Sequence, residues 1–184
     1  MVPETYEIPE GQDSMVVLEE DGLKVTAFTV QHPPIVPAVG YRFDYKGRSI
    51  SISGDTIYSE TLIEASKGVD LMLHDALSPE LLGRITATAR EAGLTTRAAI
   101  LDDVPDYHAT APQAADAARG RMDRATHCSR IVPPLPLKGL EEVFLADAED
   151  RYDGPLWLAQ DGDLYSLPAG GGELQKSNMI GRGR

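Results

Sequence analysis

Apolar and polar residues alternate with a period of two along the first part of the chain, which is typical of β-strands. Four strands are predicted, at Met15–Glu19, Leu23–Val30, Tyr41–Tyr45 and Arg48–Ser53. Asp21-Gly22 and Lys46-Gly47 separate them in pairs, and glycine allows the positive φ of a tight turn. In the fourth strand the isoleucines share one face and the serines the other. The pattern therefore predicts two β-hairpins.

From residue 59 onward, helical segments alternate with short strands. Helices are predicted at residues 59–67, 79–92, 110–122 and 140–152, and strands at 69–74 and 125–132. Thr110 and Gln113 have the spacing of a capping box at the start of the third helix. A closing hairpin is predicted from Leu156–Ala159 and Leu164–Leu167. This order favours an α+β or α/β fold, with one mixed sheet flanked by helices.

Composition limits the size and surroundings of the protein. The 184 residues, 42% of them hydrophobic, suit a single domain over 1–184, with flexible ends at 1–13 and 170–184. The formal net charge of −12 disfavours general attraction to nucleic acid or to an anionic membrane. No stretch approaches 18 apolar residues and the start lacks a basic end with an apolar run, so a cytoplasmic location is expected.

Candidate chemistry centres on histidines and one aspartate at the ends of predicted elements. The histidines are His32, His74, His108 and His127, and Asp55 follows the fourth strand. Imidazole and carboxylate groups bind zinc and related divalent ions. Spacing alone leaves alternatives open, because Asp55 can also serve as a turn residue and His74 as a core histidine.

Several segments together resemble a known family. They are Gly40-Tyr-Arg-Phe, Ser53-Gly-Asp-Thr56, "GVDLMLHDA", "YHATAPQAADAA", "IVPPLPLKGLEEVF" and Ser166-Leu-Pro-Ala169. Over residues 14–170 the chain resembles the C-terminal half of metallo-β-lactamase-fold hydrolases, in the branch of ribonuclease Z and its esterase- and lactonase-like relatives. The resemblance implies half of an αββα sandwich.

The same resemblance implies roles for individual residues. Asp55 is similar to an aspartate that bridges two metal ions, and His108 to a histidine that assists proton transfer or contacts substrate. The metal candidates are Asp55, His74 and His127, and the candidate substrate contacts are His32, Tyr41 and Thr56. Zinc is the metal that the family implies, with manganese, calcium or no metal as alternatives. Other acidic residues are expected to be solvated, namely Asp70, Asp75, Asp102, Asp103 and Asp106.

The chain also departs from the family's pattern. The family's primary metal motif, His-x-His-x-Asp-His, belongs to the N-terminal half and is absent from this sequence. Arg130 stands where the family has a histidine before Val-Pro-Pro, and His127 lies three positions earlier. We expect that Arg130 can pair with Asp55 in place of a cation, or stabilise an oxyanion.

Three functions follow as hypotheses. The main one is a hydrolase of small esters or lactones, including acyl-homoserine lactones, with catalytic residues His108, Asp55 and Arg130. Its expected partners are a small-molecule substrate and a second copy bound through the exposed half-sandwich face, without nucleic acid or membrane. The alternatives are a non-catalytic half-fold that self-associates or is completed by a partner, and a ribonuclease Z-like phosphodiesterase.

Overall fold

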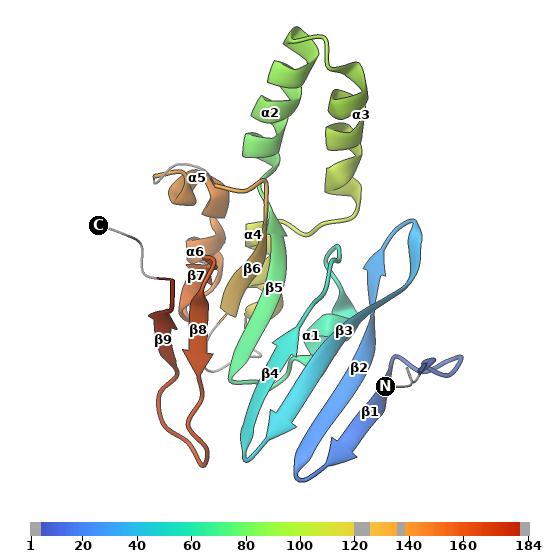
Figure 1. The fold of residues 1–184 in the computed structure, drawn as a ribbon, viewed down its shortest axis with the longest axis vertical. Helices are drawn as coiled ribbons and strands as arrows, with labels where there is room; N and C mark the ends of the chain where they lie inside the picture. The colour runs from blue at the N-terminus through green and yellow to red at the C-terminus, as the bar shows by residue number, and fades with distance from the viewer. Residues whose placement is uncertain (1–4, 120–125, 136–138, 181–184) are drawn as a thin grey trace.

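The protein is built around a seven-stranded mixed sheet (Figure 1). Its computed structural model describes residues 5–119, 126–135 and 139–180, without the side chains of 126–130. In chain and spatial order the strands are β1 (Ser14–Glu20), β2 (Leu23–His32), β3 (Ile35–Tyr45), β4 (Arg48–Ile52), β5 (Leu71–Leu77), β6 (Thr126–Val132) and β7 (Leu156–Leu158). Strands β1 to β4 pair antiparallel, whereas β4 to β7 pair parallel. The two predicted hairpins are therefore confirmed as one antiparallel meander.

Helices supply the core on one face of the sheet. They are α1 (Glu60–Ala65), α4 (Ala111–Ala118), α5 (Glu141–Leu145) and α6 (Ala148–Arg151). Met72 of β5 packs in one cluster with the alanines of α4 and with Phe144, and Phe28 of β2 packs against Leu62 of α1. The predicted capping box forms, with Thr110 as N-cap and Gln113 as its partner. No helix within the described ranges is both long and apolar enough to cross a membrane.

The opposite face of the sheet also carries apolar residues, of which Val25, Ala27 and Leu71 are buried whereas Tyr41 and Ile52 are exposed. Register places them in two cross-strand rows, Ala27–Tyr41–Ile52–Leu73 and Val25–Phe43–Ile50–Leu71, which we call the open face. Tyr41 is 40% exposed and Ile52 36% exposed. The serines of β4 point the other way, and Ser51 accepts a hydrogen bond from Ser66 beside α1 at 2.8 Å. The apolar side of β4 thus faces away from the helices.

A helical hairpin projects beyond the end of β5 (Figure 1). It consists of α2 (Pro79–Glu91) and α3 (Thr95–Asp103), and a short 3-10 helix, η1 (Val104–Asp106), follows it. Helix α2 begins at the N-cap Ser78, and its expected closing residue Gly93 has a positive φ of 72°. Helix α3 was not predicted, because its apolar residues have no clear helical period and only Ala98 is buried.

The C-terminal part differs most from expectation. Strand β7 joins the main sheet beside β6, and β8 (Asp163–Ser166) pairs with β9 (Gln175–Asn178) in a separate sheet. The closing hairpin was therefore wrong, and β9 lies within the end that was expected to be flexible. The predicted helix over 140–152 is divided at Ala146, whose φ of 52° is incompatible with a continuous right-handed helix.

Gly40 illustrates how closely β2, β3 and β4 pack. It lies opposite Phe28 in the β2–β3 register, and a Cβ there would stand 2.8 Å from the carbonyl oxygen of Ile52 and closer still to the Phe28 ring. We expect Gly40→Ala to lower the free energy of unfolding by about 1–3 kcal/mol through overpacking. Urea denaturation would measure this change.

Gly83→Ala is the matched control for that substitution. Gly83 is exposed within α2, and a Cβ added there would meet nothing within 4 Å beyond the backbone of its own helix. Because alanine favours the helix, this variant should be more stable by about 0.5–1 kcal/mol. Equal stability of Gly40→Ala and the wild-type protein would contradict the close packing around Phe28.

Candidate active site

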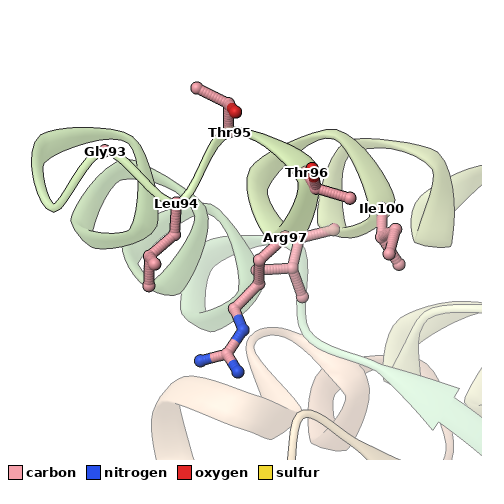
Figure 2. Close-up of a pocket in the computed structure, with 7 residues that line it drawn as sticks. Gly93, Leu94, Thr95, Thr96, Arg97 and Ile100 are labelled. Carbon is pink, nitrogen blue, oxygen red and sulfur yellow. The ribbon is translucent and has the colours of Figure 1, made fainter.

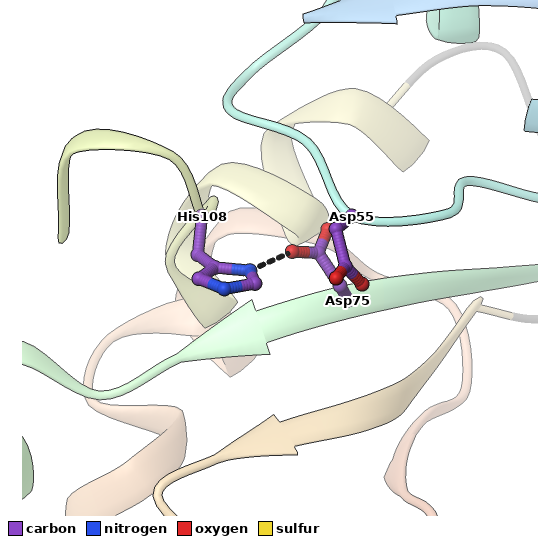
Figure 3. Close-up of side chains that lie close together, drawn as sticks. All are labelled: Asp55, Asp75 and His108. Atoms are coloured by element: carbon purple, nitrogen blue, oxygen red, sulfur yellow. Dashed lines mark hydrogen bonds and ion pairs between the residues drawn. The ribbon is translucent and has the colours of Figure 1, made fainter. Parts of the chain in front are cut away.

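Two aspartates and one histidine from separate segments meet at one end of the sheet. Asp55 follows β4, Asp75 lies in the adjacent parallel strand β5, and His108 precedes α4 (Figure 3). One ligand atom from each lies within 4.8 Å of the other two. Parallel strands bring their carboxyl ends to the same edge, which places Asp55 and Asp75 side by side.

Asp75 is the buried centre of this group. Its side chain is 1% exposed, and its Oδ2 atom lies 2.8 Å from Nδ1 of His108. Nδ1 of His74 lies 3.2 Å from the other carboxylate oxygen, and the Thr56 backbone N–H donates to Oδ2 at 3.4 Å. Burial by itself would raise the pKa of Asp75, but hydrogen bonds from His108 and His74 outweigh it and lower the pKa below its ordinary value. The carboxylate is therefore ionised near neutral pH.

The ionised carboxylate determines the orientation of His108. A carboxylate only accepts hydrogen bonds, so Nδ1 of His108 carries the proton that points to Asp75. Nε2 is then the ring nitrogen left to exchange a proton or to bind a ligand. The side chain of His108 is 9% exposed, which limits its contact with bulk water.

Backbone and hydroxyl contacts hold the loop that carries Asp55. The Asp75 N–H donates to Oγ of Ser53 at 3.0 Å, so β5 is bonded directly to the residue two positions before Asp55. Thr56 is fully buried, and its hydroxyl donates to the carbonyl oxygen of Gln31 at 3.1 Å. These contacts hold the residues on both sides of Asp55 in place.

Sequence reasoning placed some of these residues correctly and missed one. Asp55 and His108 come together as candidate site residues. Asp75 was expected to be solvated and is instead buried within the site, because β5 carries it between two histidines. Its signal in the sequence was an acidic residue at the end of the apolar run Leu71–Leu73.

The other predicted site residues are not part of the ligand group, although several of them adjoin it. His74 is fully buried, with Nδ1 2.7 Å from the Asp75 carbonyl oxygen, and it is outside the ligand group. Thr56 has no exposed surface with which to contact substrate, and Tyr41 lies on the open face. His32 lies beside His108, with ring centroids 5.4 Å apart, so it borders the site. Asp70, also expected to be solvated, is buried with its carboxylate 3.3 Å from Nε of Arg48.

Two predicted residues lie on β6. Strand register sets His127 opposite Leu73 and Arg130 opposite Asp75, after an irregularity in the pairing. Their side chains lie outside the described part of the chain, and so does the predicted pairing of Arg130 with Asp55.

A large surface hollow is separate from this group. This depression of about 670 Å³ lies at the tip of the α2–α3 hairpin (Figure 2). It is lined by Leu94, Thr96, Arg97, Ile100 and neighbouring residues, and no carboxylate or imidazole is among them. The candidate chemistry therefore remains with Asp55, Asp75 and His108.

Comparisons with known proteins agree with this fold. No family model matches the chain. The chain is 27% identical to ribonuclease Z of Mycobacterium avium over 159 residues, which is 86% of this chain and 52% of that protein. It is 23% identical to ribonuclease Z of Mycobacterium tuberculosis over 143 residues, 78% of this chain and 48% of that protein. The chain thus spans about half the length of the curated relatives it matches.

A solved structure shows the same architecture. The metallo-β-lactamase fold protein YhfI from Bacillus subtilis matches with a TM-score of 0.51 and 15% identity, covering 78% of this chain and 49% of that one. The protein has half of a metallo-β-lactamase-type fold, a mixed sheet flanked by helices. Within that class it is a ribonuclease Z-like chain.

These relatives correct the expected partners. The sequence predicted a small-molecule substrate and no nucleic acid, whereas the matched relatives are ribonucleases by name. That expectation is therefore wrong. It depended on the net charge of −12, which describes the sum over the chain and not the local chemistry around Asp55 and His108. The comparisons likewise favour the phosphodiesterase alternative over a lactonase.

Proposed function

We propose that this chain is the C-terminal half of a metal-dependent phosphodiesterase that cleaves RNA in the manner of ribonuclease Z. The observation that carries the proposal is the group Asp55, Asp75 and His108 at the edge of a metallo-β-lactamase-type sheet. The similarity to ribonuclease Z over 86% of the chain supports the choice of substrate class. Among the described residues, no contact specifically favours an ester or a lactone.

The donor set suits a divalent ion. Asp55 and Asp75 offer two carboxylates, a ligand type that zinc accepts, and they would hold the ion, with the His108 imidazole within 4.8 Å of both. A zinc ion bound here would polarise a phosphoryl oxygen and lower the pKa of water. Two ligands form only part of a metal centre, so the proposal includes further ligands from outside this group.

The residues of this chain have distinct tasks in the proposed reaction. Asp75 accepts the Nδ1 proton of His108, which leaves Nε2 as the nitrogen that can exchange a proton. His108 can then give a proton to the leaving oxygen or take one from water, as general acid–base catalysis requires. The low exposure of both side chains strengthens their hydrogen bond.

The open face is the surface over which the remaining ligands of the proposed metal centre would be supplied. Tyr41 and Ile52 lie in the same cross-strand row, and Ile52 is three residues from Asp55. We propose that a second β-sheet with an apolar inner face covers the open face and brings histidine ligands to the edge beside Asp55. The relatives are about twice as long as the matched region, which leaves room for such a sheet. It could belong to the same polypeptide or to another.

A reconstitution experiment tests the function. The chain is co-expressed with the remaining half of Mycobacterium avium ribonuclease Z, and hydrolysis of bis(p-nitrophenyl) phosphate and of an RNA with a 3′ trailer is measured with added zinc. We expect cleavage only when both parts are present and only without chelator. Hydrolysis of a lactone but of neither phosphodiester would overturn the proposal.

Substitution of Ile52 tests the docking surface. Ile52→Lys would bury an unpaired charge in the proposed interface, and we expect it to weaken association by about 30-fold or more, equivalent to about 2 kcal/mol. Ile100→Lys is the control, since Ile100 is 58% exposed on α3 and outside the open face. Analytical ultracentrifugation measures both. Equal association of both variants, or assembly of the chain only with itself, would count against a second sheet at this face.

A further inference from the structure

His32 connects the end of β2 to Tyr107, which lies 75 residues further along the chain and directly precedes His108. Its Nδ1 atom lies 2.8 Å from the carbonyl oxygen of Tyr107. A carbonyl oxygen only accepts hydrogen bonds, so Nδ1 of His32 must carry the proton and Nε2 must be unprotonated in the neutral ring. The bond therefore requires one particular tautomer of His32.

Ring contacts reinforce this connection. The centroid of His32 lies 5.1 Å from that of Tyr107 and 5.4 Å from that of His108, and the Tyr107 and His108 centroids are 5.2 Å apart. The His32 contacts have edge-on geometry, with interplanar angles of 79° and 62°. The three rings thus contact one another and restrict the rotation of His108.

The residue after His108 is held from the same strand end. The Ala109 N–H donates to the Thr56 carbonyl oxygen at 2.7 Å. The Thr56 hydroxyl in turn donates to the carbonyl oxygen of Gln31 at 3.1 Å and accepts from the Gln31 N–H at 3.2 Å. Tyr107 is thus bonded to His32, and Ala109 is connected through Thr56 to Gln31. The last two residues of β2 secure both neighbours of His108.

We propose that His32 is a positioning residue that sets the distance between His108 and Asp75. Without its hydrogen bond, the segment after η1 loses one of its two connections to β2, and His108 is free to move away from the carboxylate. The inference deepens the proposed function, since the proton-transfer role of His108 rests on that function. The link from His32 to His108 is itself a property of the isolated chain and can be measured without activity.

The test compares imidazole signals by ¹⁵N-resolved NMR in the full chain. The wild-type protein should show His32 protonated at Nδ1, and a protected Nδ1 proton on His108 bonded to Asp75. His32→Leu removes the donor, and we expect the protected His108 signal to be lost. His32→Asn places an amide N–H near the position of Nδ1, and we expect it to restore the signal.

Activity of the reconstituted enzyme gives a second readout. We expect His32→Leu to lower kcat by about 10–100-fold with KM little changed, and His32→Asn to recover most of it, as for other residues that orient a site group. Thr61→Val is the control, because the Thr61 hydroxyl also donates to a β2 carbonyl, that of Thr29, but contacts none of the three rings.

The outcomes separate the two proposals. His32 protonated at Nε2 in the wild-type protein, or an unchanged His108 signal in His32→Leu, would overturn the positioning role. The wild-type tautomer tests it even if the leucine variant does not fold. A His108 signal that depends on His32, in a reconstituted protein that cleaves no phosphodiester, would uphold the link and reject the proposed function.

Discussion

Asp75→Asn is expected to lower the free energy of unfolding by about 3 kcal/mol at pH 7, because it removes a buried charge that accepts a hydrogen bond from His108 and lies 3.2 Å from Nδ1 of His74. Asparagine keeps the shape of the side chain but weakens both contacts. Urea unfolding with an unchanged m-value would measure the loss. Asp44→Asn is the control, since Asp44 pairs with Arg42 at the surface with its side chain 37% exposed, and we expect less than about 1 kcal/mol there.

The pH dependence of the free energy of unfolding tests whether ionised Asp75 stabilises the folded protein. The pKa of Asp75 is lower in the folded protein than its unfolded value of 3.8. Its contribution is therefore complete well above pH 3.8 and is lost as the pH falls through the lower, folded pKa. The difference between wild type and Asp75→Asn should shrink below about pH 4. A constant difference between pH 7 and pH 3 would show that ionisation of Asp75 is not what stabilises the fold.

Asp55→Ala is expected to abolish the activity of the reconstituted enzyme, lowering kcat by more than about 100-fold, since even residues behind the metal ligands contribute 10–100-fold. Loss of one of the two clustered carboxylate ligands should also remove bound zinc. Metal content after dialysis, measured by plasma mass spectrometry, and phosphodiester hydrolysis would be determined on the same samples.

Asp106→Ala is the matched control for Asp55→Ala. Asp106 is an exposed carboxylate two residues before His108 and lies outside the ligand group. It should retain both metal and activity. Full metal occupancy in Asp55→Ala would mean that Asp55 is a turn residue and that the centre is built from other side chains.

Local interactions explain which parts of the fold were predictable from sequence. The β1–β2 and β3–β4 hairpins follow from alternation and from turn glycines, and α4 follows from Thr110 and Gln113, because each signal acts between residues close together in the chain. Strand β7 was misassigned because each residue of Leu156–Leu158 pairs with a β6 residue 30 positions earlier, and no turn signal specifies a partner at that distance. Helix α3, without a clear apolar period, was missed.

The same distinction applies to the candidate site. Neighbouring residues in the sequence are enough to place Asp55 just after a strand and His108 just before a capped helix. That Asp75 is their buried partner, and that His32 is bonded to Tyr107, is visible only in the folded protein. These side chains become buried and hydrogen bonded where β2, β5 and the segment before α4 meet. The three segments are far apart in the chain, so no local sequence pattern indicates that they are neighbours.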